Sequence, residues 1–357
     1  MADPKSKMTE FLLEAAKQNA SDLHINVGRY PTLRIDDNLL PLVKEQLITP
    51  DASAELLPSV LSDDQKATLE KYRDVDFSIS IDNKARFRCN VFYQRGNHLA
   101  GAFRYIPSQI RTIEELNLPS ILKGFSNYEQ GFILVVGPAG VGKSTTLAAL
   151  IDSINHTFAK HIITIEDPVE YIFNQDKSII NQREIGRFGG TWHRALRSAL
   201  RQDPDVLMVG EMRDPASIAI AITAAETGHL VFSTLHTNSA SQTIDRIIDS
   251  FPASQQNQIK IQLASTLVGI VSQRLIPKKQ GGRVPATEIM FATPAIRNLI
   301  REGKVYQIDL VIETSTQEGM LSLNRSLVAL VKAGHITKED ADNYSLNPTE
   351  LKYLLES

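Results

Sequence analysis

Cysteine is nearly absent from this chain of 357 residues, which contains only Cys89. A single cysteine forms no internal disulfide and builds no cysteine-rich zinc site. The chain also has no apolar run near the roughly 18 residues that a membrane-spanning helix needs, and its first segment, 1–18, lacks an apolar signal core. We therefore expect a cytoplasmic protein without disulfides or membrane spans.

The chain also lacks a large excess of positive or negative charge. The 38 lysines and arginines nearly balance the 41 aspartates and glutamates, so the formal net charge is −3. Such a balance argues against a protein that mainly coats nucleic acid, although it is compatible with a local basic patch. The length exceeds that of one ordinary domain, and the 42% apolar content is enough for sizeable cores. We expect two domains and no direct contact with nucleic acid.

Residues 1–107 are expected to form a mixed α+β domain with an antiparallel sheet, because alternating apolar residues are interrupted by turn and helix-start signals. Residues 108–118 are expected to be a linker. From 119 to 357, fully apolar runs alternate with helical patterns, which predicts an α/β domain of the RecA type, with a parallel sheet covered on both faces. The expected parallel strands cover 132–136, 161–166, 205–209 and 230–235. Beyond Pro252 the chain is expected to be mostly helical.

The clearest motif runs from Gly131 to Thr146, GFILVVGPAGVGKSTT. An apolar strand leads into a glycine-rich turn that matches the P-loop pattern G-x-x-x-x-G-K-[ST] at every fixed position. The backbone N–H groups of such a turn, together with the positive end of the following helix, bind phosphate oxygens. Lys143 is expected to reach the β- and γ-phosphates of ATP, and Ser144 to supply a hydroxyl to Mg²⁺. The residues expected to contact the nucleotide are Gly137, Pro138, Ala139, Gly140, Val141, Gly142, Lys143, Ser144 and Thr145.

Two further apolar runs end in acidic residues. The sequence LMVGE has the form of a Walker B strand in which Gly210 replaces the usual aspartate, and Glu211 is expected to activate the attacking water beside Mg²⁺. In the sequence ITIEDP, Glu166 and Asp167 likewise come at the end of an apolar run. Because ligands of open α/β sheets bind at the carboxyl ends of the strands, Glu166 is the better candidate for the metal and water shell. Asp167 is also compatible with a simple turn cap.

Histidines flank the expected strand 230–235, with His229 before it and His236 after it. A spacing of seven residues places them on opposite faces of a regular strand, so we do not expect them to share one ligand. A lone histidine at a strand end is more often structural than functional. The residues alone therefore leave both roles open.

Four segments together resemble the secretion ATPase superfamily. GPAGVGKSTT, ITIEDPVEY, RQDPDVLMVGEMRD and TGHLVFSTLHTNSA are similar to its Walker A motif, Asp box, Walker B motif and His box, in the order and spacing of that family. Within it, the chain resembles the type IV pilus retraction ATPases (PilT-type), through ASDLHI, RFRCNVFYQ, TAAETGHLVF and AIRNLIRE as well. The resemblance covers nearly the whole chain, and the glycine in the Walker B motif is part of the family pattern.

The resemblance implies a PAS-like N-terminal domain and a RecA-like domain with a helical C-terminal region, assembled as a homohexameric ring with ATP between the two domains. It also implies that Lys143, Ser144 and Thr145 hold the phosphates and Mg²⁺. Glu211 would be the catalytic glutamate, close to the metal, and Glu166 would support metal and water.

The same resemblance gives expectations for histidines and for arginines of the N-terminal domain. His229 is expected near the phosphates, and His236 is expected to couple the nucleotide to domain contacts. Arg88 and Arg104 lie in the segment whose arginines reach the γ-phosphate in such enzymes, although each is also compatible with a solvated strand residue. Arg95 competes for this role, because the sequence around it departs from the family pattern.

The missing cysteines favour the retraction subclass, since pilus extension and type II secretion ATPases usually carry a four-cysteine zinc site that this chain cannot build. The resemblance implies ATP hydrolysis that drives type IV pilus retraction and twitching motility at the cytoplasmic side of the inner membrane. Expected partners are further copies of the chain, the inner-membrane platform protein of the pilus and a paralogous retraction ATPase. Alternatives that stay open are an assembly or secretion ATPase, a nucleotide-gated scaffold that does not hydrolyse ATP, and a nucleic-acid translocase, which the near-neutral charge disfavours.

The AIRNLIRE segment resembles a signature of retraction ATPases and is expected to transmit motion or engage the pilus base. It follows Thr293-Pro294, a helix-start signal. Helical spacing places one apolar and one polar face on it, and the alternative is a helix that only packs in the core. The apolar face would hold Ala295, Ile296, Leu299 and Ile300, and the polar face Arg297, Asn298 and Arg301.

Overall fold

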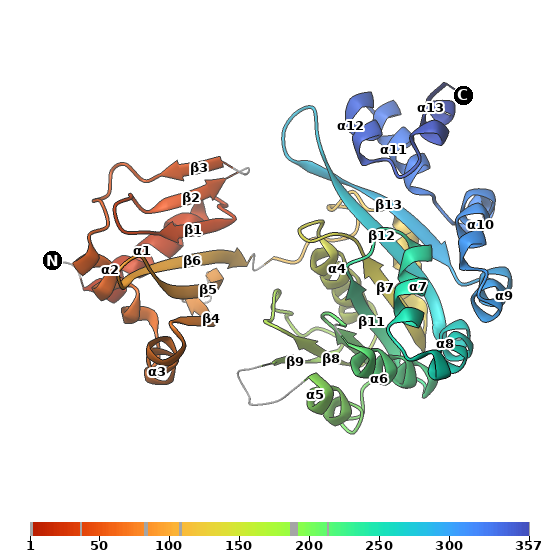
Figure 1. Cartoon of the computed structure of the whole chain (residues 1–357), viewed down its shortest axis with the longest axis horizontal. Helices are drawn as coiled ribbons and strands as arrows, with labels where there is room; N and C mark the ends of the chain where they lie inside the picture. Colours follow the sequence, from red (N-terminus) through yellow and green to blue (C-terminus); the bar gives the residue numbers. More distant parts are fainter. Residues whose placement is uncertain are drawn as a thin grey trace. The chain divides into compact units, whose positions relative to one another are not determined.

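The computed structural model describes residues 3–35, 38–81, 85–106, 109–185, 192–212 and 214–356. The chain divides into two compact units. The first consists of Met1–Gln109 with Glu170–Ile172, and the second of Ile110–Val169 with Phe173–Ser357. Residues 110–118, expected in a linker, therefore group with the second unit. Figure 1 draws the first unit mainly in red to orange and the second in yellow to blue.

The first unit is an α+β structure built on one antiparallel sheet of six strands, in the order β3-β2-β1-β6-β5-β4. Burial alternates along β5, so that one face of the sheet packs into the core and the other is partly exposed. Cys89 lies on the buried face, and burial raises the pKa of its thiol. The strands are β1 (Asp22–Ile25), β2 (Thr32–Ile35), β3 (Asn38–Pro41), β4 (Asp74–Ile81), β5 (Ala85–Gln94) and β6 (His98–Ile106), and the helices are α1 (Pro4–Lys17), α2 (Pro50–Leu56), η1 (Pro58–Val60) and α3 (Asp63–Tyr72).

The second unit contains a seven-stranded sheet in the order β13-β12-β7-β11-β10-β8-β9. Every neighbouring pair is parallel except β12 and β13, which form an antiparallel hairpin. The predicted α/β fold is confirmed, and four of the strands were predicted from their apolar runs. The strands are β7 (Gly131–Val136), β8 (His161–Glu166), β9 (Ile179–Glu184), β10 (Val206–Val209), β11 (Leu230–Leu235), β12 (Leu267–Pro277) and β13 (Arg283–Phe291).

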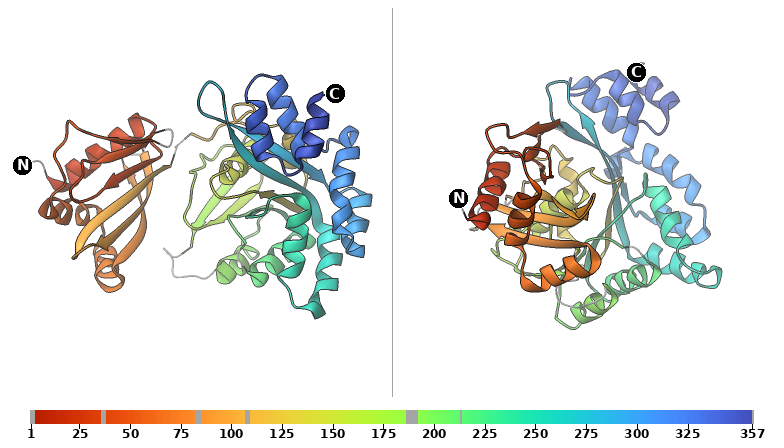
Figure 2. Two further views of the ribbon diagram at one scale, coloured as in Figure 1. Left: turned by 45° about the horizontal axis from the view of Figure 1, so that its top comes forward. Right: turned by 60° about the vertical axis from the view of Figure 1, so that its left-hand side comes forward.

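Helices cover both faces of this sheet, as Figures 1 and 2 show. Side-chain caps begin several of them: Asp214 accepts from Ser217 N at the start of α6, and Ser239 accepts from Gln242 N at the start of α7. None of the helices in the described ranges is long and apolar enough to cross a bilayer. The helices are η2 (Ser120–Asn127), α4 (Lys143–Thr157), α5 (Trp192–Ala199), α6 (Pro215–Glu226), α7 (Ala240–Asp249), α8 (Ala253–Thr266), α9 (Pro294–Glu302), η3 (Val305–Gln307), α10 (Ile308–Thr314), η4 (Thr316–Glu318), α11 (Leu323–Lys332), α12 (Lys338–Tyr344) and α13 (Pro348–Glu356).

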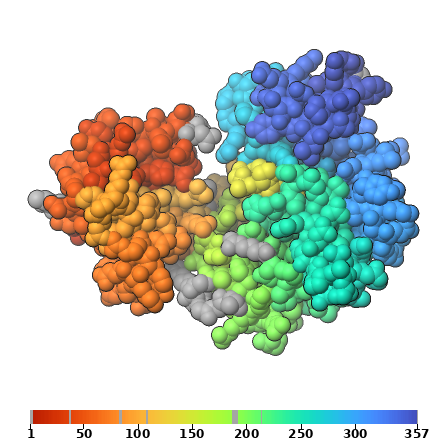
Figure 3. Space-filling model, viewed as in Figure 1, coloured from red at the N-terminus to blue at the C-terminus, as the bar shows by residue number. Residues whose placement is uncertain are grey.

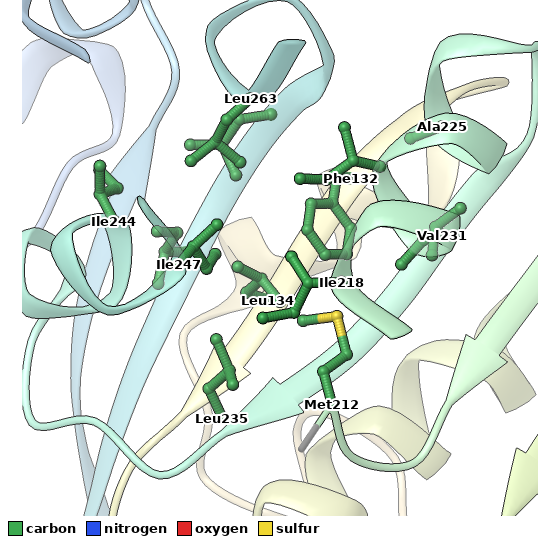
Figure 4. Packing of buried hydrophobic residues seen from close by; sticks show 14 of the residues in the cluster. Phe132, Leu134, Met212, Ile218, Ala225, Val231, Leu235, Ile244, Ile247 and Leu263 are labelled. Atoms are coloured by element: carbon green, nitrogen blue, oxygen red, sulfur yellow. The ribbon is translucent and has the colours of Figure 1, made fainter. Parts of the chain in front are cut away.

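The main core lies between one face of the sheet and helices α6, α7 and α8 (Figure 4). Phe132 and Leu134 alternate along β7 and reach this cluster together with Val231 of β11. Met212, two residues beyond Gly210, also points into it. The carboxyl end of β10 is thereby anchored on the core directly beside Glu211.

The expectation that the chain is mostly helical beyond Pro252 is wrong for 267–291, which forms the β12–β13 hairpin. All eight residues from Leu267 to Arg274 are buried, so the run has no period of two by which a strand is recognised. The end of the hairpin packs on α11, α12 and α13 in a smaller core. These C-terminal helices gather on one surface of the second unit, coloured dark blue in Figure 3.

Candidate functional site

The phosphate-binding loop connects a buried strand to a helix that starts without a side-chain cap. All six residues of β7 are buried, and α4 begins at Lys143 directly after the loop. The N-cap of α4 is Gly142, which has no side chain to accept from the first N–H groups of the helix. Ser144 and Thr145 lie in this first turn, so their N–H groups and hydroxyls belong to the positive end of the helix. An anion at this position would complete the helix start.

Two glycines permit the shape of the loop. Gly142 has φ 88, in the left-handed region, and Gly137 has φ 146. A Cβ on Gly137 would come within 2.5 Å of the Gln273 carbonyl oxygen, so no other residue fits against β12 there. Lys143 is only 8% exposed, and its Nζ donates to the carbonyls of Gly137 at 2.9 Å and Pro138 at 2.8 Å. The lysine ammonium is thereby held against the inside of the loop.

The predicted acidic residues lie at the same edge of the sheet as the loop. Strands β8 and β10 are parallel neighbours, with Ile165 opposite Val209, so Glu166 and Glu211 follow adjacent strand ends. A Cβ on Gly210 would come 3.3 Å from the Ile165 carbonyl oxygen, so a side chain at this position would be in tight contact with β8. Glu166 is buried, and its Oε1 accepts from Thr164 Oγ1 at 2.7 Å. Glu211 is more open, with 28% of its side chain exposed.

His236 connects the lysine of the loop with Glu211. It follows β11, which lies between β7 and β10 in the sheet. Its Nδ1 is 3.4 Å from Lys143 Nζ, and its Nε2 is 3.4 Å from Glu211 Oε1. Because the ammonium has only protons to donate, Nδ1 accepts, and the proton of the neutral ring is on Nε2, directed at Glu211. Lys143, His236 and Glu211 thus form one polar chain across three strand ends.

His229 lies at the opposite end of the same strand. Its carbonyl accepts from Gly131 N at the start of β7, and its Nδ1 is 2.9 Å from the Ala224 carbonyl oxygen. The six residues of β11 separate it from the P-loop edge, which is roughly 20 Å at the usual rise per residue. Within this chain His229 therefore lies at the opposite end of β11 from the phosphate-binding loop, and His236 is the histidine beside Lys143.

One residue of the site was missed in the sequence. Gln273 of β12 is 3% exposed, and its Nε2 donates to the Val141 carbonyl at 2.6 Å while its Oε1 accepts from Thr146 Oγ1 at 2.8 Å. One side chain therefore bridges the phosphate-binding loop and the first turn of α4. No local pattern marks this residue, since Val141 and Gln273 are 132 positions apart.

The donor set is compatible with Mg²⁺ bound together with a nucleotide. In the described ranges, no group of three or more histidines, cysteines or carboxylates is arranged to hold a metal alone. Mg²⁺ commonly binds through one or two protein ligands, substrate phosphates and water. The Ser144 hydroxyl and the Glu211 carboxylate, at one edge of the sheet, meet this requirement.

The predicted arginines belong to the first unit. Arg88 of β5 and Arg104 of β6 are directly opposite each other, so their side chains leave the same face of the sheet. Both are exposed, and Arg104 Nε donates to Asp22 Oδ1 at 3.0 Å. Arg95 lies in the turn between these strands, with φ 21, and not in this cross-strand row. Arg88 and Arg104 therefore form one group from which Arg95 is separate.

The AIRNLIRE helix differs from its expected division into two faces. Ile296 and Ile300 of α9 are buried as expected, but Ala295 is exposed. Arg297, expected on the polar face, donates to the carbonyls of Ala292, Ala264 and Ser265 and so closes the carboxyl end of α8. Arg301 is exposed and donates to Asn298 Oδ1 at 2.5 Å. Arg297 thus makes its hydrogen bonds within the fold, and the exposed polar side chains of α9 are those of Asn298, Arg301 and Glu302.

Comparisons with known proteins cover nearly the whole chain. A family model described as "Type II/IV secretion system protein" matches residues 5–283. The type IV pilus retraction ATPase PilT of Pseudomonas aeruginosa is 48% identical over 340 residues, which are 94% of this chain and 96% of that protein. A twitching motility protein of Neisseria gonorrhoeae is 46% identical over 309 residues, 85% of this chain and 82% of that one. A crystal structure of the pilus retraction motor PilT with bound ADP matches with a TM-score of 0.90 at 47% identity, covering 97% of this chain and 98% of that chain.

Proposed function

This chain belongs to the type II/IV secretion system protein family, and from that premise we propose that it is the ATP-hydrolysing motor of type IV pilus retraction. The observation that carries the proposal is the likeness to a retraction motor over 97% of the chain at a TM-score of 0.90. The names of the relatives, a pilus retraction ATPase and a twitching motility protein, agree with this function. The resemblance expected from the sequence is confirmed.

The reaction is the hydrolysis of ATP to ADP and phosphate at the carboxyl edge of the second sheet. The loop from Gly137 to Gly142 and the start of α4 bind the phosphates, and Lys143 neutralises the β- and γ-phosphates. Mg²⁺, when bound, neutralises charge that develops on the transferred phosphoryl group. Ser144 and Glu211 would hold it. The ADP bound to the related motor supports a nucleotide at the corresponding place.

Glu211 orients and deprotonates the attacking water. Its carboxylate is partly open, whereas Glu166 is buried and accepts a hydrogen bond from Thr164. Glu211 is therefore the accessible base, and Glu166 orders the surrounding water. His236 lies between Lys143 and Glu211, where it holds the Glu211 carboxylate in position and senses the γ-phosphate.

The assembly that we propose is a homohexamer in which Arg88 and Arg104 supply positive charge to the γ-phosphate, with Arg95 as the alternative. Two arginines on one sheet face fit a phosphate better than a single turn residue. The motor would act at the cytoplasmic face of the inner membrane. Its partners would be the platform protein of the pilus and a paralogous retraction ATPase.

Deletion of the gene in its host tests the direction of the motor. Pili should accumulate on the surface and twitching should stop, and the wild-type chain should restore both while Glu211→Gln should not. Loss of surface pili would instead indicate an assembly ATPase. Full complementation by Glu211→Gln would indicate a scaffold that does not hydrolyse ATP. ATP hydrolysis that is stimulated by DNA would indicate a nucleic-acid translocase.

The α9 surface is the candidate for motor output. Arg301→Ala removes an exposed side chain and should keep the ATPase rate and the melting temperature while retraction is lost. Arg297→Ala is the matched control, because it removes the donor to two carbonyls at the end of α8 and to the Ala292 carbonyl before α9, and should lower the melting temperature. Normal retraction by Arg301→Ala would show that the surface is not needed for output.

A further inference from the structure

Neighbouring residues of β12 reach two different parts of the candidate site. Side chains alternate between the faces of a strand, so Gln273 points to one face, whereas Ser272 and Arg274 point to the other. Gln273 contacts the phosphate-binding loop and α4, and Arg274 contacts the segment after β11. We infer that Gln273 and Arg274 are separate positioning residues, Gln273 for the phosphate-binding loop and Arg274 for the segment that carries His236. This inference rests on the proposed ATPase function.

Gln273 restrains the loop at its carboxyl-terminal part. Its amide holds the Val141 carbonyl at 2.6 Å and the Thr146 hydroxyl at 2.8 Å, and its own main chain lies against Gly137. The loop is therefore fixed at both ends relative to β12. These contacts involve neither the Lys143 ammonium nor the Ser144 hydroxyl. Their loss disorders the loop without removing any group that contacts the γ-phosphate.

Arg274 restrains the segment that follows β11. Its Nη2 donates to the main-chain carbonyl and to the side-chain Oδ1 of Asn238, both at 3.0 Å, and its Nη1 donates to the Gln273 carbonyl at 3.0 Å. Ser272 Oγ donates to the same Asn238 carbonyl at 2.9 Å. Asn238 is two residues after His236, so the hydrogen bonds from the buried Ser272 and Arg274 to the exposed Asn238 set where the imidazole lies between Lys143 and Glu211.

The network continues to the start of α7. Glu288 of β13 is directly opposite Ser272, on the same face of the sheet, and its Oε1 accepts from Ala240 N at 2.7 Å. The segment from His236 to Ala240 is therefore held at Asn238 and at Ala240 by the β12–β13 hairpin. The Gln273 side chain takes no part in these contacts, and only its main-chain carbonyl accepts from Arg274 Nη1.

The two residues should affect different kinetic constants. A loosened phosphate-binding loop weakens the binding of ATP and of ADP alike, which raises KM and leaves kcat nearly unchanged. A displaced His236 disturbs the groups around the γ-phosphate and the water, which lowers kcat. A residue with only a structural role would lower the melting temperature and the active fraction without this division.

The experiment compares Gln273→Met and Arg274→Met in the full-length assembled protein, with steady-state hydrolysis and equilibrium ADP binding. Gln273→Met should raise the KM for ATP and the Kd for ADP by about 10-fold with kcat within about twofold. Arg274→Met should lower kcat by about 10-fold with KM within about threefold. Arg274→Lys, which keeps the charge and one donor position, should recover part of kcat.

Variants of the partner residues repeat the test where a core substitution prevents folding. Thr146→Val removes the donor to Gln273 and should raise KM, and Asn238→Ala removes the acceptor of Arg274 and should lower kcat. Asn324→Leu is the matched control, since Asn324 is buried and donates to the Asn347 carbonyl in the C-terminal helices. It should lower the melting temperature and change neither constant.

Equal effects of both substitutions on KM and kcat, or effects on melting temperature alone, would overturn the inference. Such a result in a wild-type protein that hydrolyses ATP leaves the proposed function intact. Failure of the wild-type protein to hydrolyse ATP would instead remove the proposed function, and the inference with it.

Discussion

In the seven-stranded sheet, residues typical of active sites lie both at the carboxyl ends of the strands (the carboxyl edge) and at their amino ends (the amino edge). Only the carboxyl edge brings such residues together. At the carboxyl edge, Lys143, His236 and Glu211 follow three neighbouring strands and form one polar chain. At the amino edge, His229 contacts the Ala224 carbonyl of α6, and His161 contacts the Asp203 carbonyl before β10. The difference follows from the parallel topology, since strand carboxyl ends meet the uncapped start of α4, whose positive end attracts phosphate. Position at an edge, more than residue type, therefore separates functional from structural residues.

The largest expected effect is at the carboxyl edge. Glu211→Gln removes the base but keeps the shape of the side chain, so kcat should fall about 10²-fold or more while ATP binding is retained. The comparison is Asp205→Asn at the amino edge, where the carboxylate accepts from His161 N. Turnover measured at saturating ATP should be close to wild type for Asp205→Asn. A rate near wild type for Glu211→Gln would transfer the role of base to Glu166.

The two histidines that flank β11 give the second test. His236→Ala removes the group between Lys143 and Glu211, so kcat should fall about 10-fold and the preference for ATP over ADP should decrease. His229→Ala should keep that preference, because His229 is remote from the phosphates. Competition binding of the two nucleotides measures the preference directly. Loss of the preference in His229→Ala alone would reverse the comparison.

Glu288, near the carboxyl edge, gives a test through the pH dependence of the unfolding free energy. Burial raises the pKa of this carboxyl to about 7, and Asp309 adds to the shift while Arg274 opposes it. Since the folded-state pKa is raised, the stabilisation is complete below the ordinary value of 4.5 and is lost as the pH rises through about 7. Between pH 4 and pH 8 the wild type should therefore lose about 3 kcal/mol of unfolding free energy relative to Glu288→Gln. Urea unfolding of both proteins at the two pH values measures this difference. Parallel pH dependences would show that Glu288 does not titrate in the folded state.

His156 gives the smallest expected effect and lies at the other end of α4, toward the amino edge. The hydrogen bond that His156 donates to Asp176, with a contribution from the Asp152 charge, raises the pKa of His156. Its stabilisation is present below the ordinary value of 6.5 and is lost as the pH rises through the higher folded-state value. The pair is exposed, so His156→Asn should cost roughly 0–1 kcal/mol at pH 5. Melting curves at pH 5 and pH 9 should differ between variant and wild type only at pH 5. A difference that persists at pH 9 would have another cause.

The sequence alone was enough for the parts of the fold that local patterns specify. The strand before Gly137, the loop and α4 were predicted because each depends on neighbouring residues. The β12–β13 hairpin was missed because a strand buried on both faces has no alternation. Gln273 was missed because its partners, Val141 and Thr146, are far away in the sequence.

The histidines show a different kind of error. The sequence placed His229 before an expected parallel strand and His236 after it, and the rule that ligands bind at carboxyl ends already favours His236. The resemblance to the family gave the opposite assignment, whereas in the structure His236 is the histidine beside Lys143. For Arg297 no sequence signal was present, since its acceptors lie at the end of another helix.

The most direct test of the carboxyl edge as the ATPase site is an experimental structure of the Glu211→Gln variant with ATP and Mg²⁺. The γ-phosphate should lie within about 4 Å of Lys143 Nζ, with Ser144 near the metal and His236 beside the phosphate. His229 should contact no part of the nucleotide. A nucleotide bound elsewhere, or a γ-phosphate in contact with His229, would contradict this account.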